Sequence, residues 1–301
     1  MVQPEDFEWA VDDVTQVEDV NGDGIPVVLL NKKIPNAEVQ LSGMKYKENW
    51  PRQYLNYMFN LTFRWIKYLN DRAGKVSGKN YLINGDFNIW QRATSFTGSG
   101  YTADRWSAAG AAGSAVSKVA DSPSGFGSCA ELTHTAGSNW LQTRLEGANS
   151  APLALQVCTI SYWTYNISGN ALATLIVESA DALDDFSTYT LVSSATKTSV
   201  LNTWTKHTHT FTATAAVSNG IQIRIVSGSA AAVNRIANVK LEEGEYATNF
   251  EQRNVGEELA LCQRYGQIVS TNSVDEADLR PSMRDTPAIT GSGPYFYDAE
   301  L

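Results

Sequence analysis

Hydrophobic and polar residues alternate along several short segments in the middle of the chain. In one of them Ile221, Ile223 and Ile225 fall on one side of an extended backbone, and Gln222 and Arg224 fall on the other. A period of two residues is typical of an antiparallel strand with one face in the core. The predicted strands are Leu153–Trp163, Ala171–Val177, Thr203–Thr212, Gly220–Val226 and Ile236–Leu241. Because turn residues separate them and no helical pattern lies between them, we expect two packed antiparallel sheets, a β-sandwich.

Two segments at the start of this region predict further extended structure. Residues 80–92 predict an opening strand with a turn at Asn84–Gly85. Residues 101–106 predict a second strand that ends on a buried aromatic residue, Trp106. No catalytic group is arranged around either segment.

The pattern before residue 75 is that of a helix with an unusually wide apolar surface. Asn49 is the predicted cap, and Pro51 lies in the first turn of a helix that runs to about Asn70. Its polar residues form one narrow stripe, whereas a surface helix is usually apolar over only about a third of its circumference. We therefore expect it to pack against copies of itself or against a partner protein, with burial under its own chain as the alternative. The residues expected at this contact are Leu55, Met58, Leu61, Trp65 and Leu69.

These patterns divide the chain into three regions. Residues 1–75 are acidic and then helical, and residues 76–250 form the predicted sandwich. Residues 251–301 begin with a short helix and continue into the start of a C-terminal β region.

Composition narrows the function classes. The formal net charge of −9 argues against sequence-independent nucleic-acid binding, which depends on basic residues replacing the counterions of phosphates. The chain has no long apolar run for membrane insertion, and its first residues are acidic where an export signal is basic and then apolar. The three cysteines, Cys129, Cys158 and Cys262, are widely spaced and are expected to be buried free thiols. The chain is therefore expected to fold in the cytoplasm.

The sequence does not single out a catalytic site. It contains no nucleophile elbow, zinc-protease motif, phosphate-binding loop or dinucleotide fingerprint. Its adjacent acids, such as Asp184–Asp185, point to opposite faces of a strand and cannot flank one scissile bond together. His207 and His209 share one strand face, but two histidines alone make an incomplete metal site. We expect a protein that is not an enzyme.

Aromatic residues supply candidate contacts for sugars. The chain has 8 Trp and 13 Tyr, and ring faces complement the apolar side of a pyranose. Most rings are expected in the core, but Tyr101 and Trp140 lie beside Gly- and Ser-rich loops and are the candidate glycan-binding residues.

Three separated segments resemble one protein family. Residues 49–60 with 65–69 are similar to the N-terminal helical motif of bacteriophage and prophage tail fibre proteins. Residues 84–92 with 103–106 resemble the start of their jelly-roll module, a sandwich similar to carbohydrate-binding modules. A third segment resembles the closing strand of this jelly-roll module and the helix that follows it. It comprises Ile236–Gly244, Ala247–Glu251 and Gly256–Tyr265.

The resemblance implies a homotrimer in the phage virion. Residues 1–75 would attach to a tail or baseplate protein, and the jelly roll would face a host-surface glycan, with another fibre protein at the C-terminus as a further partner. A structural calcium often lies between the first strand and acids of the last strand in such modules. Here Asp86 and Glu242 are weak candidates for it, because Ala237–Asn238 stand where an acid pair is expected. The alternatives are a purely structural tail adaptor and a glycan depolymerase.

Overall fold

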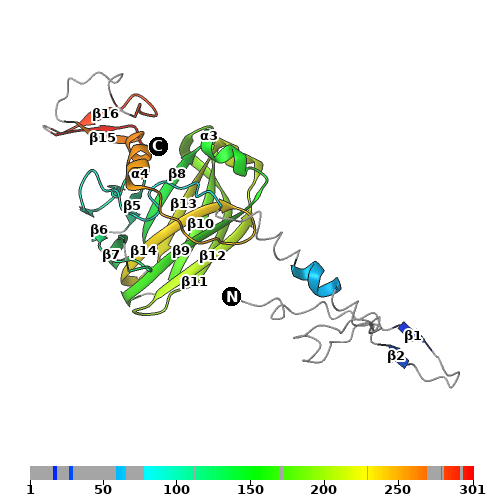
Figure 1. Ribbon diagram of the computed structural model, residues 1–301. Coiled ribbons are helices and arrows are strands. Elements are labelled where there is room, and N and C mark those ends of the chain that lie inside the picture. Colours follow the sequence, from blue (N-terminus) through cyan, green and yellow to red (C-terminus); the bar gives the residue numbers. More distant parts are fainter. Residues whose placement is uncertain are drawn as a thin grey trace. The chain divides into compact units, whose positions relative to one another are not determined.

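The chain forms two units in the computed structural model, Met1–Val76 and Ser77–Leu301 (Figure 1). The structure describes residues 16–18, 27–29, 59–65, 78–110, 113–125, 127–169, 172–228, 230–269, 279, 281–291 and 294–301. No helix within these ranges has both the length and the apolar character needed to cross a membrane.

The first unit contains a short strand pair and a helical stretch. Strand β1 (Gln16–Glu18) pairs antiparallel with β2 (Val27–Leu29), and residues 59–65 are helical. Leu61 and Trp65 lie in this stretch, half-buried and exposed respectively. The other residues predicted at the helix contact, Leu55, Met58 and Leu69, lie outside the described residues.

The second unit is built on two six-stranded sheets, which confirms the predicted β-sandwich. The strand order is β11-β10-β13-β8-β5-β4 in one sheet and β12-β9-β14-β7-β6-β3 in the other (Figure 1). Neighbouring strands pair antiparallel in both sheets. The strands are β3 (Ser95–Thr97), β4 (Gly100–Tyr101), β5 (Ser107–Gly110), β6 (Ala115–Val119), β7 (Cys129–Ala136), β8 (Asn139–Glu146), β9 (Val157–Gly169), β10 (Leu172–Ala182), β11 (Asp185–Thr198), β12 (Trp204–Thr212), β13 (Gly220–Ser227) and β14 (Ala230–Glu243). The five strands predicted from alternation correspond to β9, β10, β12, β13 and β14.

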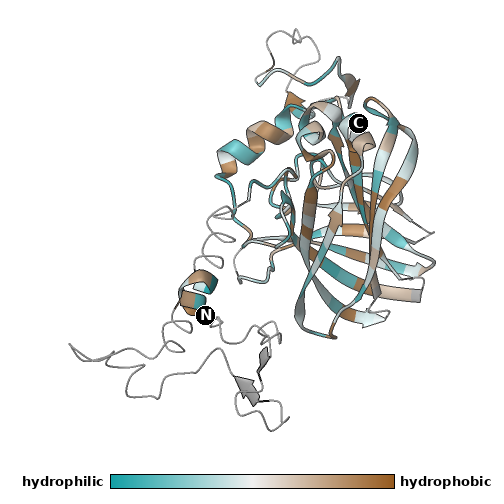
Figure 2. Cartoon of the chain, turned by 90° about the vertical axis from the view of Figure 1, so that its right-hand side faces the viewer, coloured by the Kyte–Doolittle hydropathy of each residue, from teal (hydrophilic) through white to brown (hydrophobic). Residues whose placement is uncertain are grey.

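Alternation along the strands produces the core between the sheets. Ile221, Ile223 and Ile225 of β13 are at most 1% exposed, and they join Leu141 and Leu175 of the neighbouring strands in one hydrophobic cluster. Figure 2 shows apolar and polar residues alternating along the strands of the sandwich. Burying one side chain of this size contributes about 1.5–3 kcal/mol, so the inward positions fix the register of each strand.

The opening of the sandwich departs from the sequence prediction. The segment over residues 80–92 is not a strand, and Trp106, although fully buried, lies in a turn before β5 rather than at the end of a strand. The predicted turn is present, because the Phe87 amide donates to the Asn84 carbonyl at 3.1 Å. The Tyr81 amide donates to the Leu241 carbonyl at 2.9 Å, but the Leu241 amide donates to the side-chain oxygen of Asn80 at 3.1 Å, so a side chain completes this pairing. A side-chain bond of this kind leaves no pattern of alternation.

A helix and a small sheet follow the sandwich. Helix α4 (Val255–Gln263) begins at Asn254, whose side chain accepts from the Gly256 amide, and it confirms the short helix predicted after residue 251. Strands β15 (Gly266–Val269), β16 (Ala288–Thr290) and β17 (Tyr295–Asp298) form a sheet of order β15-β17-β16. The short helical turns between sandwich strands are α3 (Gly147–Ser150), η2 (Ala151–Leu153) and η3 (Ala215–Asn219).

The three cysteines are free and buried, as expected from their spacing. Burial raises the pKa of Cys129 to about 12 and that of Cys158 to about 11. Burial also raises the pKa of Cys262. All three thiols therefore stay protonated at neutral pH.

Candidate functional site

Polar and aromatic side chains gather on the outward face of the sheet that runs from β11 to β4. Along β8, Trp140, Gln142 and Arg144 alternate with the core residues Leu141 and Leu145 and so point away from the core. Strands β13 and β10 continue the same rows, because Gln222 lies opposite Arg144 in the register and Glu178 lies opposite Gln222. We call the following set the polar face: Trp140, Gln142, Arg144, Glu178, Tyr189, Gln222 and Arg224.

A line of hydrogen bonds crosses three strands of the polar face. Arg144 Nε donates to Gln222 Oε1 at 2.7 Å, and Gln222 Nε2 donates to Glu178 Oε2 at 2.9 Å. Arg224 forms an ion pair with the other oxygen of Glu178. Glu178 and Gln222 are only 4% and 1% exposed. Because each group holds its neighbour, the outer donors are fixed in orientation before any ligand arrives.

Two aromatic rings flank the guanidinium at the end of this line. The guanidinium carbon of Arg224 lies 6.0 Å from the centre of the Trp140 ring and 5.5 Å from that of Tyr189. Trp140 is half-buried and its Nε1 donates to Gln142 Oε1 at 3.3 Å, while Tyr189 is 43% exposed. Arg224 Nε is buried and has no hydrogen-bond partner among the described residues. An unsatisfied donor beside two rings suits a ligand with apolar faces and many acceptor hydroxyls.

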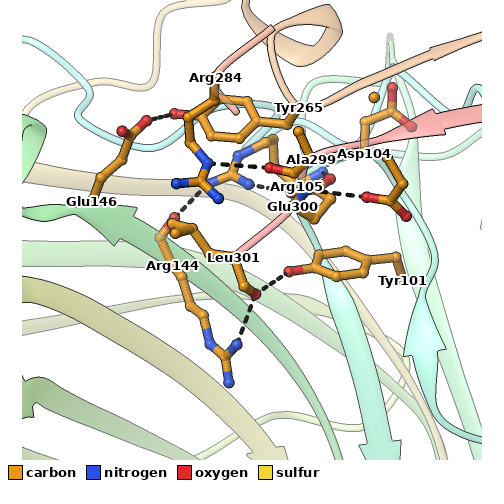
Figure 3. Close-up of polar contacts among 12 residues, drawn as sticks. Tyr101, Asp104, Arg105, Arg144, Glu146, Tyr265, Arg284, Ala299, Glu300 and Leu301 are labelled. Atoms are coloured by element: carbon orange, nitrogen blue, oxygen red, sulfur yellow. Dashed lines mark hydrogen bonds and ion pairs between the residues drawn. The ribbon is translucent and has the colours of Figure 1, made fainter. Parts of the chain in front are cut away.

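Tyr101, the other candidate glycan-binding residue, is placed differently. It is half-buried at the end of β4, and its hydroxyl donates to the Leu301 carbonyl at 2.6 Å (Figure 3). The Arg92 guanidinium carbon lies 5.1 Å from the centre of its ring. Burial raises the pKa of Tyr101 to about 12, with Glu300 adding to the rise. The structure thus places Trp140 on the polar face and Tyr101 against the last residue of the chain.

The two calcium candidates take different partners. The Asp86 carboxylate accepts from Asn88 Nδ2 at 2.7 Å. Glu242 forms an ion pair with Lys240 at 3.2 Å and accepts from the Thr248 amide at 2.7 Å. Within the described ranges, no group of three or more His, Cys, Asp or Glu side chains is arranged to hold a metal ion. A buried ammonium therefore already supplies the positive charge at Glu242, and the residues present do not fit a calcium site.

The two histidines of β12 are held within the sandwich by hydroxyl groups. His207 Nε2 lies 2.8 Å from Thr164 Oγ1, and His209 Nε2 lies 2.8 Å from Ser193 Oγ. Burial lowers the pKa of both residues, with Lys197 as a second cause. These hydroxyl contacts account for one ring nitrogen, Nε2, of each histidine without a metal.

Sequence reasoning identified only one residue of the polar face as a ligand contact. The alternation of β13 placed Gln222 and Arg224 on its polar side. Nothing near them in the sequence indicates that Glu178 and Tyr189 lie beside them in the fold. The signal that was available is the charge of Arg224 on an otherwise isoleucine-rich strand. A charged residue in the centre of a sheet needs a partner on a neighbouring strand.

Comparisons with known proteins give distant structural likenesses. No family model matches the chain, and no curated protein matches its sequence. The chain is similar to the enzymatically active domain of tailspike protein 4 from bacteriophage CBA120, with 11% identity and a TM-score of 0.40. This match covers 55% of the chain but only 21% of the tailspike domain.

Two xylanase-derived structures give similar values. The xylan-binding CBM22-1 domain of Xyn10C from Paenibacillus barcinonensis matches with 17% identity and a TM-score of 0.39, over 56% of the chain and 97% of the domain. The CBM22-1 and GH10 modules of xylanase 10B from Clostridium thermocellum, complexed with xylohexaose, match with 14% identity and a TM-score of 0.37, over 54% of the chain and 30% of that protein. Likenesses this distant do not assign the chain to a family.

Proposed function

We propose that this protein is a component of a bacteriophage tail fibre that binds a host-surface glycan through the polar face, without catalysing a reaction. The observation that carries the glycan part is the buried, unpartnered Nε of Arg224 between the rings of Trp140 and Tyr189. The tail fibre part is supported by the three sequence segments that resemble that family, in the order in which the family carries them.

The polar face suits the chemistry of an uncharged sugar. A pyranose has an apolar face that stacks on an aromatic ring and hydroxyls around its edge that take hydrogen bonds. Trp140 and Tyr189 supply the rings, and Arg224 and Gln142 supply planar polar groups beside them. Because these groups are held by the strands and by each other, binding costs little conformational entropy.

The geometry of Glu178 favours binding over hydrolysis. Its two oxygens accept from Gln222 and Arg224, so its carboxylate holds the donors of the polar face in place. A general acid needs a proton to donate toward the ligand, and here both oxygens face the protein's own donors. This arrangement supports a role for Glu178 in positioning, and a face that binds sugars without cleaving them.

The proposed assembly is a homotrimer located in the phage tail and made in the host cytoplasm. The first unit would join the copies and dock on a tail or baseplate protein, and another fibre protein would follow at the C-terminus. Phe59 and Phe63 are 72% and 67% exposed on the helical stretch, which supports a contact with another polypeptide. Three copies of a weak sugar site gain affinity for a surface that carries many glycans.

The test is a glycan-array screen with the full chain, followed by affinity measurements on the best glycan. Trp140→Ala should weaken binding about 5–30-fold, because it removes a stacking ring worth about 1–2 kcal/mol. Trp204→Ala is the matched control, since Trp204 lies half-buried on the other sheet and should leave affinity unchanged.

Three results would contradict the proposal. Absence of binding to any glycan, together with tight association with a tail protein, would identify a structural adaptor. Release of shortened saccharides would identify a depolymerase. Equal effects of the two tryptophan substitutions would show that the bound glycan does not occupy the polar face.

A further inference from the structure

A cavity of about 210 Å³ lies at one end of β8, between the segment that opens the sandwich and helix α4. Five basic residues line it and no acidic residue does: Lys79, Arg105, Arg144, Arg253 and Arg264. Tyr265 forms part of its wall. This concentration of positive charge stands out in a chain whose formal net charge is −9.

Two of the five cations are neutralised by acids of the same chain. Arg105 forms an ion pair with Glu300, and Arg253 forms one with Glu258 at 3.0 Å. Neither acid lines the cavity. These two pairs connect the wall to acids outside the cavity, and the other three basic residues form no ion pair with a described Asp or Glu side chain.

The remaining three cations form no ion pair with an Asp or Glu side chain among the described residues. Arg144 donates to Gln222 Oε1 and to the Leu301 oxygen, and Figure 3 shows the second of these contacts. Lys79 and Arg264 are exposed, and neither side chain makes a hydrogen bond or an ion pair with a described residue. Lys79 and Arg264 therefore bring two positive charges without an acidic side-chain partner to one small cavity, and both would attract an anion there.

Arg105 adds a fixed donor to the wall. It is 2% exposed, and its guanidinium carbon lies 3.5 Å from the centre of the Tyr265 ring. One terminal nitrogen binds Glu300, and the other donates to the Arg144 carbonyl at 2.6 Å (Figure 3). The third nitrogen, Nε, is buried and has no partner among the described residues. A buried charged donor left in this state indicates a missing acceptor.

We infer that this cavity binds an oxyanion, a carboxylate or a phosphate, carried on a group no larger than a single sugar ring. Guanidinium groups bind both oxyanions through planar, charge-assisted hydrogen bonds. The volume of about 210 Å³ is below the roughly 300–1,000 Å³ of pockets for drug-sized ligands, so one ring with its acidic group fills it. Surface polysaccharides that contain uronic acids or sugar phosphates present such groups.

This site is separate from the polar face and does not rest on glycan binding there. Arg144 is the one residue that the two share, since it lines the cavity and also donates to Gln222. The two sites differ in chemistry: the polar face has two rings and the cavity has a basic lining. A protein that failed to bind neutral glycans would still bind an oxyanion in the cavity.

The experiment is calorimetric titration of the full chain with four probes: inorganic phosphate, glucose 1-phosphate, glucuronic acid and glucose. We expect saturable binding of the anionic probes and none of glucose. A preference for glucuronic acid assigns the site to carboxylates, and a preference for the phosphate probes assigns it to phosphates. The double variant Lys79→Gln/Arg264→Gln should bind the preferred probe at least about tenfold more weakly, because it removes both exposed cations.

Lys206→Gln is the matched control, since Lys206 is an exposed lysine on β12 of the other sheet. It should leave the affinity unchanged. The inference is overturned if none of the anions saturates, if glucose binds as well as they do, or if the control weakens binding as much as the double variant. Melting curves of the variants verify that each one is folded.

Discussion

At the scale of single residues, Lys240 makes the most consequential contact. It is 1% exposed, and its ammonium contacts the Thr248 hydroxyl, the Asn249 carbonyl at 3.0 Å and the Glu242 carboxylate at 3.2 Å. The three N–H donors of the ammonium are thereby satisfied by three oxygens. Lys240 in this way holds Thr248 and Asn249 against β14.

Lys240→Met should lower the free energy of unfolding by about 3–5 kcal/mol, because it leaves the carboxylate of Glu242 buried without a counter-charge. Urea denaturation followed by tryptophan fluorescence measures the change. Lys206→Met, on an exposed position of β12, should change stability by less than about 0.5 kcal/mol. A Lys240 variant as stable as this control would show that the ion pair contributes nothing to the fold.

The titration of His207 should make the free energy of unfolding depend on pH. Burial lowers its pKa to about 4, whereas an unperturbed histidine titrates at 6.5. Between these values the unfolded chain takes up a proton that the folded chain does not. The free energy of unfolding should therefore fall as the pH is lowered from about 6.5 towards 4.

Chemical denaturation at about pH 7 and about pH 5 measures this slope. The variant His207→Gln keeps a neutral polar side chain on β12 and should show a smaller loss of stability between the two pH values than the unaltered protein. Burial also lowers the pKa of His134 and His209, so some slope should remain. Equal slopes for variant and parent would mean that His207 is protonated at the same pH in both states.

At the scale of elements, alternation predicted β9, β10, β12, β13 and β14, whereas β7 and β8 were not predicted although their burial also alternates. Strand β11 was missed, and its burial explains why: it is an edge strand that pairs only with β10, and most of its 14 residues are exposed or half-buried. Such a strand carries no apolar row for sequence reasoning to detect. The opening segment was wrongly predicted as a strand, because one backbone bond from Tyr81 to Leu241 is combined with side-chain bonds of Asn80 and does not continue as a ladder.

The polar face could be predicted only in part for a related reason. Trp140 and Arg224 are 84 positions apart, and Glu178 comes from a third strand. Their meeting depends on the register between β8, β13 and β10, which is fixed by core contacts far along the chain. The residue type and its neighbours in sequence can suggest a single ligand contact, as they did for Trp140. The full set of residues on the polar face can be identified only when the pairing of the strands is known.

At the scale of the whole molecule, the apolar helix predicted before residue 75 should join copies of the chain. Deleting residues 51–70 should convert trimers to monomers in light scattering, because most of the helix circumference is apolar and must be covered. Leu61→Ser with Trp65→Ser should have the same effect, and Asn56→Ser with Lys67→Ser, on the polar stripe, should not. Trimers that persist after the deletion would place the contact between copies elsewhere.

The three buried thiols determine how the protein responds to oxidants. A thiol reacts with oxidants chiefly as the thiolate, and all three here are both shielded and held protonated. The packing of the sandwich and of helix α4 therefore protects these thiols from oxidation and from cross-linking to another copy of the chain.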